Sequence, residues 1–126
     1  ADRGEELTQL LNEKLPCSAE FLLWDGTVVI PEDVDVVINA TSIGLFPDVD
    51  AQLDFNPESL HSGMVVADVI PNPPNTRLVR DARAKGCKVI DGLGMLVNQG
   101  VIGIRHWTGV DPDPSVMRAA LEEVFG

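Results

Sequence analysis

The chain lacks long apolar runs, and this shortage bears on where the protein works. Its longest apolar stretches, 34–38 and 64–70, are each interrupted by one Asp, and both are the size of a strand. A membrane-spanning helix needs about 20 mostly apolar residues. We therefore expect no membrane association. The opening residues are not a basic segment followed by an apolar one, so no signal peptide is visible.

Basic residues are also scarce. Nine Lys and Arg stand against twenty Asp and Glu, which gives a formal net charge of −11. Binding to the phosphate backbone of nucleic acid depends on a basic surface, so we exclude nucleic acid as a partner. A small anionic ligand is compatible with this charge, because backbone amides and a single arginine can hold a phosphate locally.

Cysteine and histidine are too few and too scattered for a metal site. Cys17 and Cys87 lie in no CxxC or Cys/His spacing, and His61 and His106 are isolated from each other. The sequence therefore predicts no bound metal. Two unpaired cysteines fit reduced, buried thiols better than a disulfide framework, so we expect a cytoplasmic protein.

The residues that are present predict one α/β domain. The chain has 126 residues, 44% of them hydrophobic, which is enough for a genuine core. Helical spacing or capping signals predict four helices: 4–15, 75–85, 91–108 and a last one after Asp113. Short apolar, β-branched runs predict four strands: 20–24, 34–39, 64–70 and 87–90.

This alternation of strands and helices is typical of a doubly wound, Rossmann-type parallel sheet covered on both faces. We expect a helical turn at 57–60 and Leu78, Val79 and Ala82 facing the core from the second helix. The last helix is expected to bury its six apolar residues: Val116, Met117, Ala120, Leu121, Val124 and Phe125.

Three unusual segments follow the strands at one edge of this sheet. They are Asn39–Gly44, Asp68–Pro74 and Asp91–Gln99. Ligands of open parallel sheets bind beyond the carboxyl ends of the strands. In the last segment glycines and amides interrupt an apolar helix, although a helix-interior glycine costs about 1 kcal/mol and a buried amide needs partners. The sequence therefore predicts a ligand site at this edge.

Together these segments resemble the shikimate dehydrogenase family. INATSIGL is similar to the family's (I/V)NATxxG strand end, DVIPNPPNT to its DxxYxPxxT loop, and DGLGMLVNQG to its DGxxMLxxQ helix. The order is right and the match covers nearly the whole chain. The resemblance implies an NADP-dependent oxidoreductase, with NAD as the alternative cofactor. It would interconvert shikimate and 3-dehydroshikimate in chorismate and aromatic amino acid biosynthesis, acting on a cyclohexene carboxylate.

The resemblance also implies roles for single residues. Gln99 matches a glutamine that hydrogen-bonds substrate hydroxyls. The positions expected to contact the cofactor are Thr41, Ser42, Val69, Gly92 and, near the 2′-phosphate, Arg3 in the segment RGEEL. Position 71 departs from the family, because Pro71 stands where a substrate-contacting tyrosine is usual. A quinate dehydrogenase, or a paralogue acting on a related polyol, is therefore the close alternative.

Parts of the family's machinery are not in this chain. Its catalytic lysine and aspartate belong to an N-terminal substrate domain, and the GxGxxG phosphate loop is missing. In the strand order 3-2-1-4-5-6, residues 20–24 would be the third strand and 34–39 the fourth, so the first two strands are absent. We expect the C-terminal part of a longer polypeptide, inactive by itself, that folds poorly or associates when made alone.

The resemblance to the family predicts two units in this chain. Residues 1–108 would be a partial NAD(P)-binding Rossmann-like domain, and residues 109–126 a C-terminal helix that packs back towards the substrate domain. Family members are monomers or homodimers.

The alternative of another class is a nucleotide-binding or assembly module that has lost its chemistry. Asp68 and Asp91 are interpreted as acceptors that orient loops rather than as catalytic acids, and Asn39 as an amide that braces the backbone.

Overall fold

The computed structural model describes residues 2–125, so residues 1 and 126, the outer bounds of the two predicted units, lie outside it. Along the chain the elements are α1 (Asp2–Lys14), β1 (Val36–Asn39), the 3-10 turn η1 (Pro57–Ser59), β2 (Val65–Asp68), α2 (Arg77–Ala84), β3 (Lys88–Ile90), α3 (Gly92–Thr108) and α4 (Pro114–Phe125). The four predicted helices, the helical turn and three of the four predicted strands are confirmed.

The strands form one parallel sheet in the order β1-β2-β3. Its register places Val37, Val66 and Val89 in one row across the sheet. The following row holds Ile38, Ala67 and Ile90, and Asn39 then lies opposite Asp68. Because side chains alternate between faces along a strand, the two rows point to opposite sides. The predicted α/β class and parallel sheet are confirmed.

Only one face of this sheet is covered. Helix α2 packs on β2 and β3 and buries Leu78, Val79 and Ala82, as predicted. Leu78 and Ala82 share a core with Leu60, Met64 and Val66. On the opposite face Val36, Ile38 and Ile90 are 52%, 62% and 48% exposed. The prediction of a sheet covered on both faces is therefore wrong for the chain as described.

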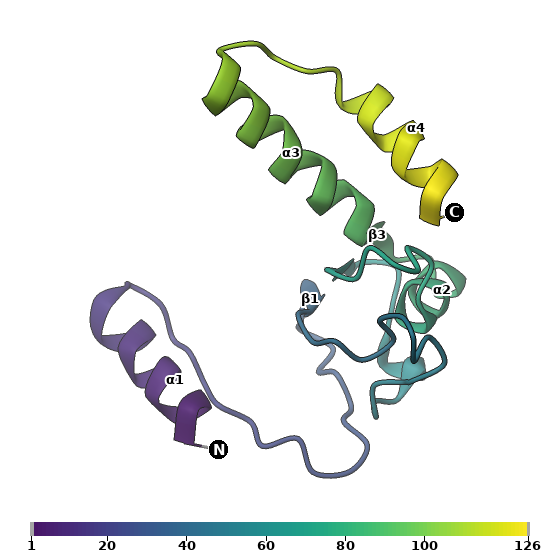
Figure 1. Cartoon of the computed structure of the whole chain (residues 1–126). Helices are drawn as coiled ribbons and strands as arrows, with labels where there is room; N and C mark the ends of the chain where they lie inside the picture. Colours follow the sequence, from purple (N-terminus) through teal and green to yellow (C-terminus); the bar gives the residue numbers. More distant parts are fainter. Residues whose placement is uncertain (1, 126) are drawn as a thin grey trace.

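The predicted strand at Glu20–Trp24 does not form. Residues 15–35 make a long connection between α1 and β1 without regular structure (Figure 1). In it Leu22, Leu23 and Trp24 are 74%, 67% and 53% exposed. A strand gains its ladder hydrogen bonds only from a neighbour, and the strands expected beside this one are not in the chain. The prediction of a strand at residues 20–24 is therefore wrong for the chain as described.

The first and last helices bury no residue of their own. Figure 1 shows α1 set apart from the sheet, while α4 runs back alongside α3. The prediction that α4 buries six apolar residues is wrong, because Val116 and Val124 are 65% and 70% exposed and Ala120 is exposed too. Met117, Leu121 and Phe125 are half-buried. Both helices therefore present apolar side chains to the outside.

The two thiols differ. Cys87 is buried, its Sγ donates to the His61 carbonyl at 3.2 Å, and burial raises the pKa of this thiol. Cys17 is free and exposed, so the prediction that both cysteines are buried is wrong for Cys17. Among residues 2–125 no helix is both long and apolar enough to cross a bilayer.

Candidate functional site

A buried network of polar side chains joins the carboxyl ends of β1 and β2. Asn39 and Asp68 are paired in the register and point to the covered face, where they are 4% and 2% exposed. The Asn39 amide nitrogen donates to Asp68 Oδ1 at 3.1 Å, and the Ile70 backbone N–H donates to the same oxygen at 3.0 Å. The prediction that Asn39 and Asp68 brace the backbone is confirmed.

The same network reaches helix α2 through Thr76. Its hydroxyl donates to Asp68 Oδ2 at 2.6 Å and accepts from the Val79 backbone N–H at 3.3 Å, which makes Thr76 the N-cap of α2. Thr76 is 2% exposed. The resemblance placed this threonine inside the matched loop motif without giving it a role. Thr76 thus ties the turn after β2 to the helix that covers the sheet.

Thr41 belongs to this network too. Both its backbone N–H and its hydroxyl donate to Asn39 Oδ1, at 3.0 and 2.8 Å. Its hydroxyl also accepts from the Ile43 backbone N–H at 3.1 Å. The Thr41 side chain is therefore used to shape the turn after β1, whereas the neighbouring Ser42 is exposed with no such inward bonds.

The turn after β2 is fixed from three sides. The Val69 backbone N–H donates to the Asn39 carbonyl at 3.1 Å. The Phe46 N–H donates to the Asn72 carbonyl at 3.0 Å, which fastens the long 44–56 connection to the same turn. On the third side Gly92, at the start of α3, lies so close that a Cβ there would overlap the Ile70 carbonyl and the Pro71 nitrogen.

This contact explains Gly92 in terms of packing. Gly92 is buried, and any larger residue would push α3 away from the turn that carries Val69. Gly94 is different, because a Cβ there would sit 3.7 Å from Asp91 Oδ1, an ordinary contact. The structure therefore brings three predicted cofactor positions, Thr41, Val69 and Gly92, together at one edge.

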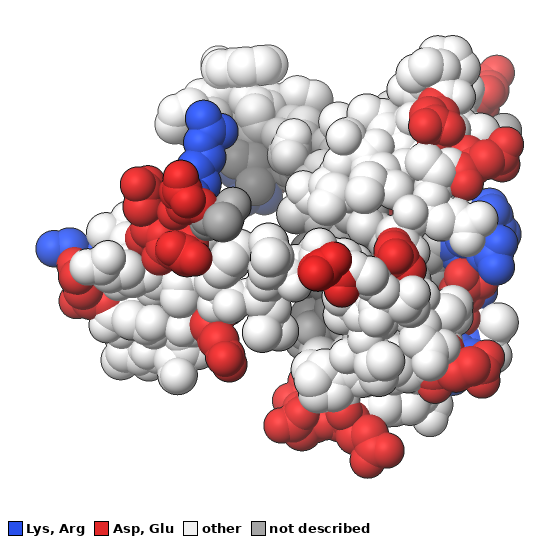
Figure 2. All heavy atoms as spheres, turned by 90° about the horizontal axis from the view of Figure 1, so that it is seen from below, with Lys and Arg blue, Asp and Glu red and all other residues white. Residues whose placement is uncertain are grey.

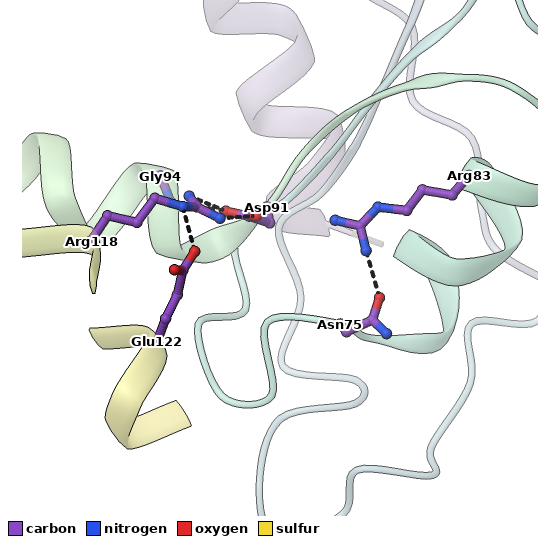
Figure 3. Close-up of polar contacts among 6 residues, drawn as sticks. All are labelled: Asn75, Arg83, Asp91, Gly94, Arg118 and Glu122. Carbon is purple, nitrogen blue, oxygen red and sulfur yellow. Dashed lines mark hydrogen bonds and ion pairs between the residues drawn. The ribbon is translucent and has the colours of Figure 1, made fainter. Parts of the chain in front are cut away.

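Asp91 begins α3 and is held by an arginine from α4. Its Oδ1 accepts from the Gly94 N–H at 3.0 Å, as an N-cap does. Arg118 forms a two-pronged pair with it: Nη1 lies 3.1 Å from Oδ1 and Nη2 lies 2.7 Å from Oδ2 (Figure 3). The Arg118 hydrogen bonds lower the pKa of the Asp91 carboxyl, and the Gly94 N–H adds to this effect.

Sequence reasoning identified Asp91 as a loop-orienting acceptor and missed Arg118 entirely. The two residues are 27 positions apart, and only the antiparallel packing of α4 on α3 brings them together. The i,i+4 pair of Arg118 with Glu122, at 2.8 Å, was visible in the sequence but reads as an ordinary surface pair. No sequence signal distinguishes this arginine from the others.

A cavity of about 260 Å³ lies beside the buried network. Asn39, Asp68 and Thr76 line it from the network, and Ala51, Gln52, Leu53, Phe55 and Pro57 line it from the long connection. Pockets that bury a drug-sized ligand hold roughly 300–1,000 Å³, so this space is too small for a dinucleotide. A dinucleotide at this edge would therefore lie across the open turns after β1 and β2, outside the cavity.

The remaining predicted site residues lie farther out. Gln99 is exposed on α3, seven residues after Gly92 and so about two helical turns along. Arg3 lies in the first turn of α1, which stands apart from the sheet (Figure 1). The structure thus groups Thr41, Val69 and Gly92, with the exposed Ser42 next to Thr41 in the chain, and it does not bring Arg3 to them.

The surface carries the charge that the composition predicts. Figure 2 shows acidic side chains in several groups on the face turned to the viewer, with few basic ones. Among residues 2–125 no group of three or more His, Cys, Asp or Glu is arranged to hold a metal ion. At this edge of the sheet lie the exposed Ser42 hydroxyl and the capped N-termini of α2 and α3.

Comparisons with known proteins agree with this geometry. Residues 92–122 match the family described as the Shikimate 5'-dehydrogenase C-terminal domain. The shikimate dehydrogenase (NADP(+)) of Methanocaldococcus jannaschii is 39% identical over 118 residues, covering 94% of this chain and 41% of that protein. The enzyme of the same name from Methanopyrus kandleri is 36% identical and covers 97% of this chain and 43% of that protein. The chain thus spans less than half the length of these relatives.

Two solved structures extend the comparison. A ligand-free 5-ketofructose reductase of Gluconobacter sp. strain CHM43 is 48% identical with a TM-score of 0.91, covering 99% of this chain and 45% of that one. Shikimate 5-dehydrogenase from Thermus thermophilus, solved with NADP(H) and shikimate, is 37% identical with a TM-score of 0.65 and covers 75% of this chain and 37% of that one. On these matches the chain belongs to the shikimate dehydrogenase family, of which it represents the C-terminal part.

Proposed function

We propose that the protein carrying this chain is an NADP-dependent dehydrogenase that reversibly oxidises shikimate to 3-dehydroshikimate, and that this chain supplies the cofactor-binding edge. The observation that carries the proposal is the hydrogen-bonded edge at which the turns after β1 and β2 and the start of α3 meet. Relatives named shikimate dehydrogenase (NADP(+)) support both the reaction and the cofactor.

The residues at this edge fit the nicotinamide end of such a cofactor. Gly92 lets the start of α3 pack directly against the turn at Ile70 and Pro71, and Ser42 presents an exposed hydroxyl beside the rigid turn at Thr41. The Val69 carbonyl lies in a turn fixed by the Asn39 and Asp68 bonds. When bound, NADPH supplies the hydride. The chain's own contribution is to orient the ring and to keep these turns from moving.

Gln99 is proposed to hold a substrate hydroxyl, because an amide both donates and accepts hydrogen bonds and this one is exposed on α3. Arg3 is proposed to meet the 2′-phosphate only after α1 has docked elsewhere than in the described arrangement. We propose further that residues 1–108 are part of the NADP-binding domain and that 109–126 face the substrate domain. Exposed Val116 and Val124 on α4 support that last assignment.

The proton-transfer residues are proposed to lie in a substrate domain outside this chain. The assembled enzyme is proposed to be a cytoplasmic monomer or homodimer. The free thiols of Cys17 and Cys87 fit a reducing compartment.

A second candidate function is reduction of a ketose such as 5-ketofructose. It is favoured by the 48% identity to the Gluconobacter reductase over 99% of this chain and by Pro71, which stands where shikimate dehydrogenases usually have a tyrosine. Loss of that hydroxyl would weaken discrimination in favour of a ring carboxylate substrate. Quinate remains a third substrate within the same reaction class.

Steady-state kinetics on the intact protein distinguish these substrates. We expect turnover of shikimate with NADP+, and we compare its kcat/KM with those for quinate and, in the reducing direction, for 5-ketofructose with NADPH. A kcat/KM for 5-ketofructose far above that for either polyol would replace the first proposal with the second. Absence of turnover with all three in a folded protein would support the non-catalytic alternative, as a nucleotide-binding module if NADP+ still binds and as an assembly module if it does not.

The role of Gln99 has its own test with a matched control. Gln99→Ala is expected to lower kcat/KM for the true substrate roughly 100-fold while leaving the Kd for NADP+ unchanged, because only a substrate hydrogen bond is removed. Asn98→Ala, at the next exposed position of α3, changes an amide that points about 100° away around the helix. Equal effects of the two variants would remove Gln99 from the site.

A further inference from the structure

We propose that Arg118 is a positioning residue that sets the charge at the start of α3 and thereby the relative affinity of the protein for reduced and oxidised cofactor. The inference rests on the proposed function, because it places the nicotinamide end near Gly92. It concerns a residue of the C-terminal helix that the family resemblance did not single out. Arg118 acts through Asp91 and touches neither substrate nor cofactor.

Asp91 is held in a fixed position by hydrogen bonds to both of its carboxylate oxygens. Both carboxylate oxygens bind the Arg118 fork, and Oδ1 also caps the helix through the Gly94 N–H (Figure 3). The Asp91 side chain is 14% exposed and that of Arg118 is 39% exposed. A two-pronged arginine–carboxylate pair holds a defined geometry as well as cancelling charge. Asp91 is therefore a fixed, neutralised group rather than a free surface acid.

The surroundings of the pair supply no replacement for Arg118. Glu122 binds the Arg118 Nε at 2.8 Å and adds a negative charge on the same helix. Arg83 extends from α2 towards Asp91, but its Nη1 donates to the Asn75 side-chain oxygen at 2.8 Å and makes no bond to Asp91 (Figure 3). Removal of Arg118 would leave two carboxylates, Asp91 and Glu122, without a cation bonded to them, and the Arg83 charge would act on Asp91 only through space.

A carboxylate without a bonded cation at this position would change the affinities for the two cofactor forms by different amounts. NADPH carries one more negative charge than NADP+, because the oxidised nicotinamide ring is a cation. Asp91 directly precedes Gly92, so a carboxylate freed there would disfavour the reduced form relative to the oxidised form. For a pair about 10 Å apart in a partly solvated site, Coulomb's law gives a preference on the order of fivefold.

Direct binding measurements on the intact protein test this. The Kd for NADPH is measured from its fluorescence and the Kd for NADP+ by competition, and the ratio Kd(NADPH)/Kd(NADP+) is compared between variants. Arg118→Met is expected to raise the ratio about fivefold. Asp91→Asn keeps an N-cap oxygen but removes one of the two carboxylates that bind Arg118 and leaves it paired with Glu122 alone, so it is expected to lower the ratio. The double variant is expected to return near the wild-type ratio, and Arg118→Lys to stay close to it.

Arg105→Met is the matched control. Arg105 pairs with Asp111 at the other end of the α3–α4 hairpin, so the substitution removes the same charge from a similar pair. The start of α3 lies about 20 Å away along the helix. We expect the ratio in this variant to equal that of the wild type.

The outcomes separate this inference from the proposed function. If wild-type protein binds both cofactor forms and Arg118→Met weakens both equally, Arg118 has a structural role only and the inference is overturned while the function stands. Equal ratios in Arg118→Met and Arg105→Met overturn it as well. If the wild-type protein binds neither form, both the proposed function and this inference fail. Opposite shifts in Arg118→Met and Asp91→Asn support it, because unfolding or loosening cannot produce opposite signs.

Discussion

The stretch from Asn39 to Val97 differs sharply from the rest of the chain. Every fully buried side chain lies within it, and so does the polar network that joins β1, β2 and α2. Outside it, α1, the connection at 15–35 and α4 bury nothing of their own. The central part holds the buried core and the buried polar network, although Phe46 and Ile90 stay exposed there, whereas the outer parts hold regular local structure with their apolar faces unpaired.

This difference shows that local sequence is enough to form a helix but not a strand. Helices α1 and α4 form because all their backbone bonds lie within the segment. The run at Glu20–Trp24 has an equally apolar sequence but makes no strand, because a strand's bonds depend on a neighbour. The outer faces are therefore best explained as surfaces that other parts of the intact protein cover, in agreement with relatives more than twice as long as this chain.

The largest expected effect contrasts a core and an outer apolar residue. Met64 is fully buried in the cluster between α2 and the sheet, so Met64→Ala should cost about 4 kcal/mol of unfolding free energy in the intact protein. Ile102 lies on α3 and is 65% exposed. If that face stays open in the intact protein, Ile102→Ala should lower the free energy of unfolding by less than about 0.5 kcal/mol. Urea denaturation measures both. A loss of several kcal/mol at Ile102 would show that the intact protein covers this face.

Much of the central region could be predicted from local sequence signals. The features that could not be predicted depend on contacts between elements that are distant in the sequence. The helix at Gly92–Thr108 was predicted over 91–108 from its apolar segment, and the end of α2 followed from Gly86, whose φ of 76° needs a glycine. These are local signals. The pairing of Asp91 with Arg118 was not predictable, because it depends on how two helices dock. The exposed apolar face of the sheet was predictable, because strands that would complete the sheet are missing from the sequence.

The next effect tests the buried network. Asp68→Ala removes the acceptor shared by the Asn39 amide, the Ile70 N–H and the Thr76 hydroxyl, and it leaves three donors buried without partners. We expect a loss of about 3 kcal/mol in unfolding free energy. Asp81→Ala is the control, because Asp81 makes only an i,i+4 pair with the half-exposed Arg77, worth about 0.5 kcal/mol or less. Similar losses in urea denaturation would contradict a special role for the network.

A smaller effect compares two glycines of one helix. Gly92→Ala places a methyl group against the Ile70 backbone and should cost about 2 kcal/mol, with weaker NADP+ binding because α3 moves from the turn at Val69. Gly94→Ala meets only ordinary contacts, so it should be neutral or stabilising by up to about 1 kcal/mol. Thermal unfolding and NADP+ titration of both variants measure this. A destabilised Gly94→Ala variant would mean that α3 is crowded along its whole first turn.

The smallest effect is the pH dependence of the Asp91–Arg118 pair. Because the Arg118 hydrogen bonds lower the pKa of Asp91 in the folded protein, the pair contributes its full stability above the unfolded carboxyl pKa of about 4. That contribution is lost as the pH falls through the depressed folded pKa. The stability difference between wild type and Arg118→Met should therefore be about 1 kcal/mol or less near pH 7, since Arg118 is partly exposed, and should shrink below pH 4. Urea denaturation at a series of pH values measures it, with Arg105→Met as the exposed-pair control. A difference that stays constant down to pH 2 would mean that Arg118 stabilises the hairpin through the packing of its aliphatic stem, and that the outer helix is joined to the central region by contact rather than by charge.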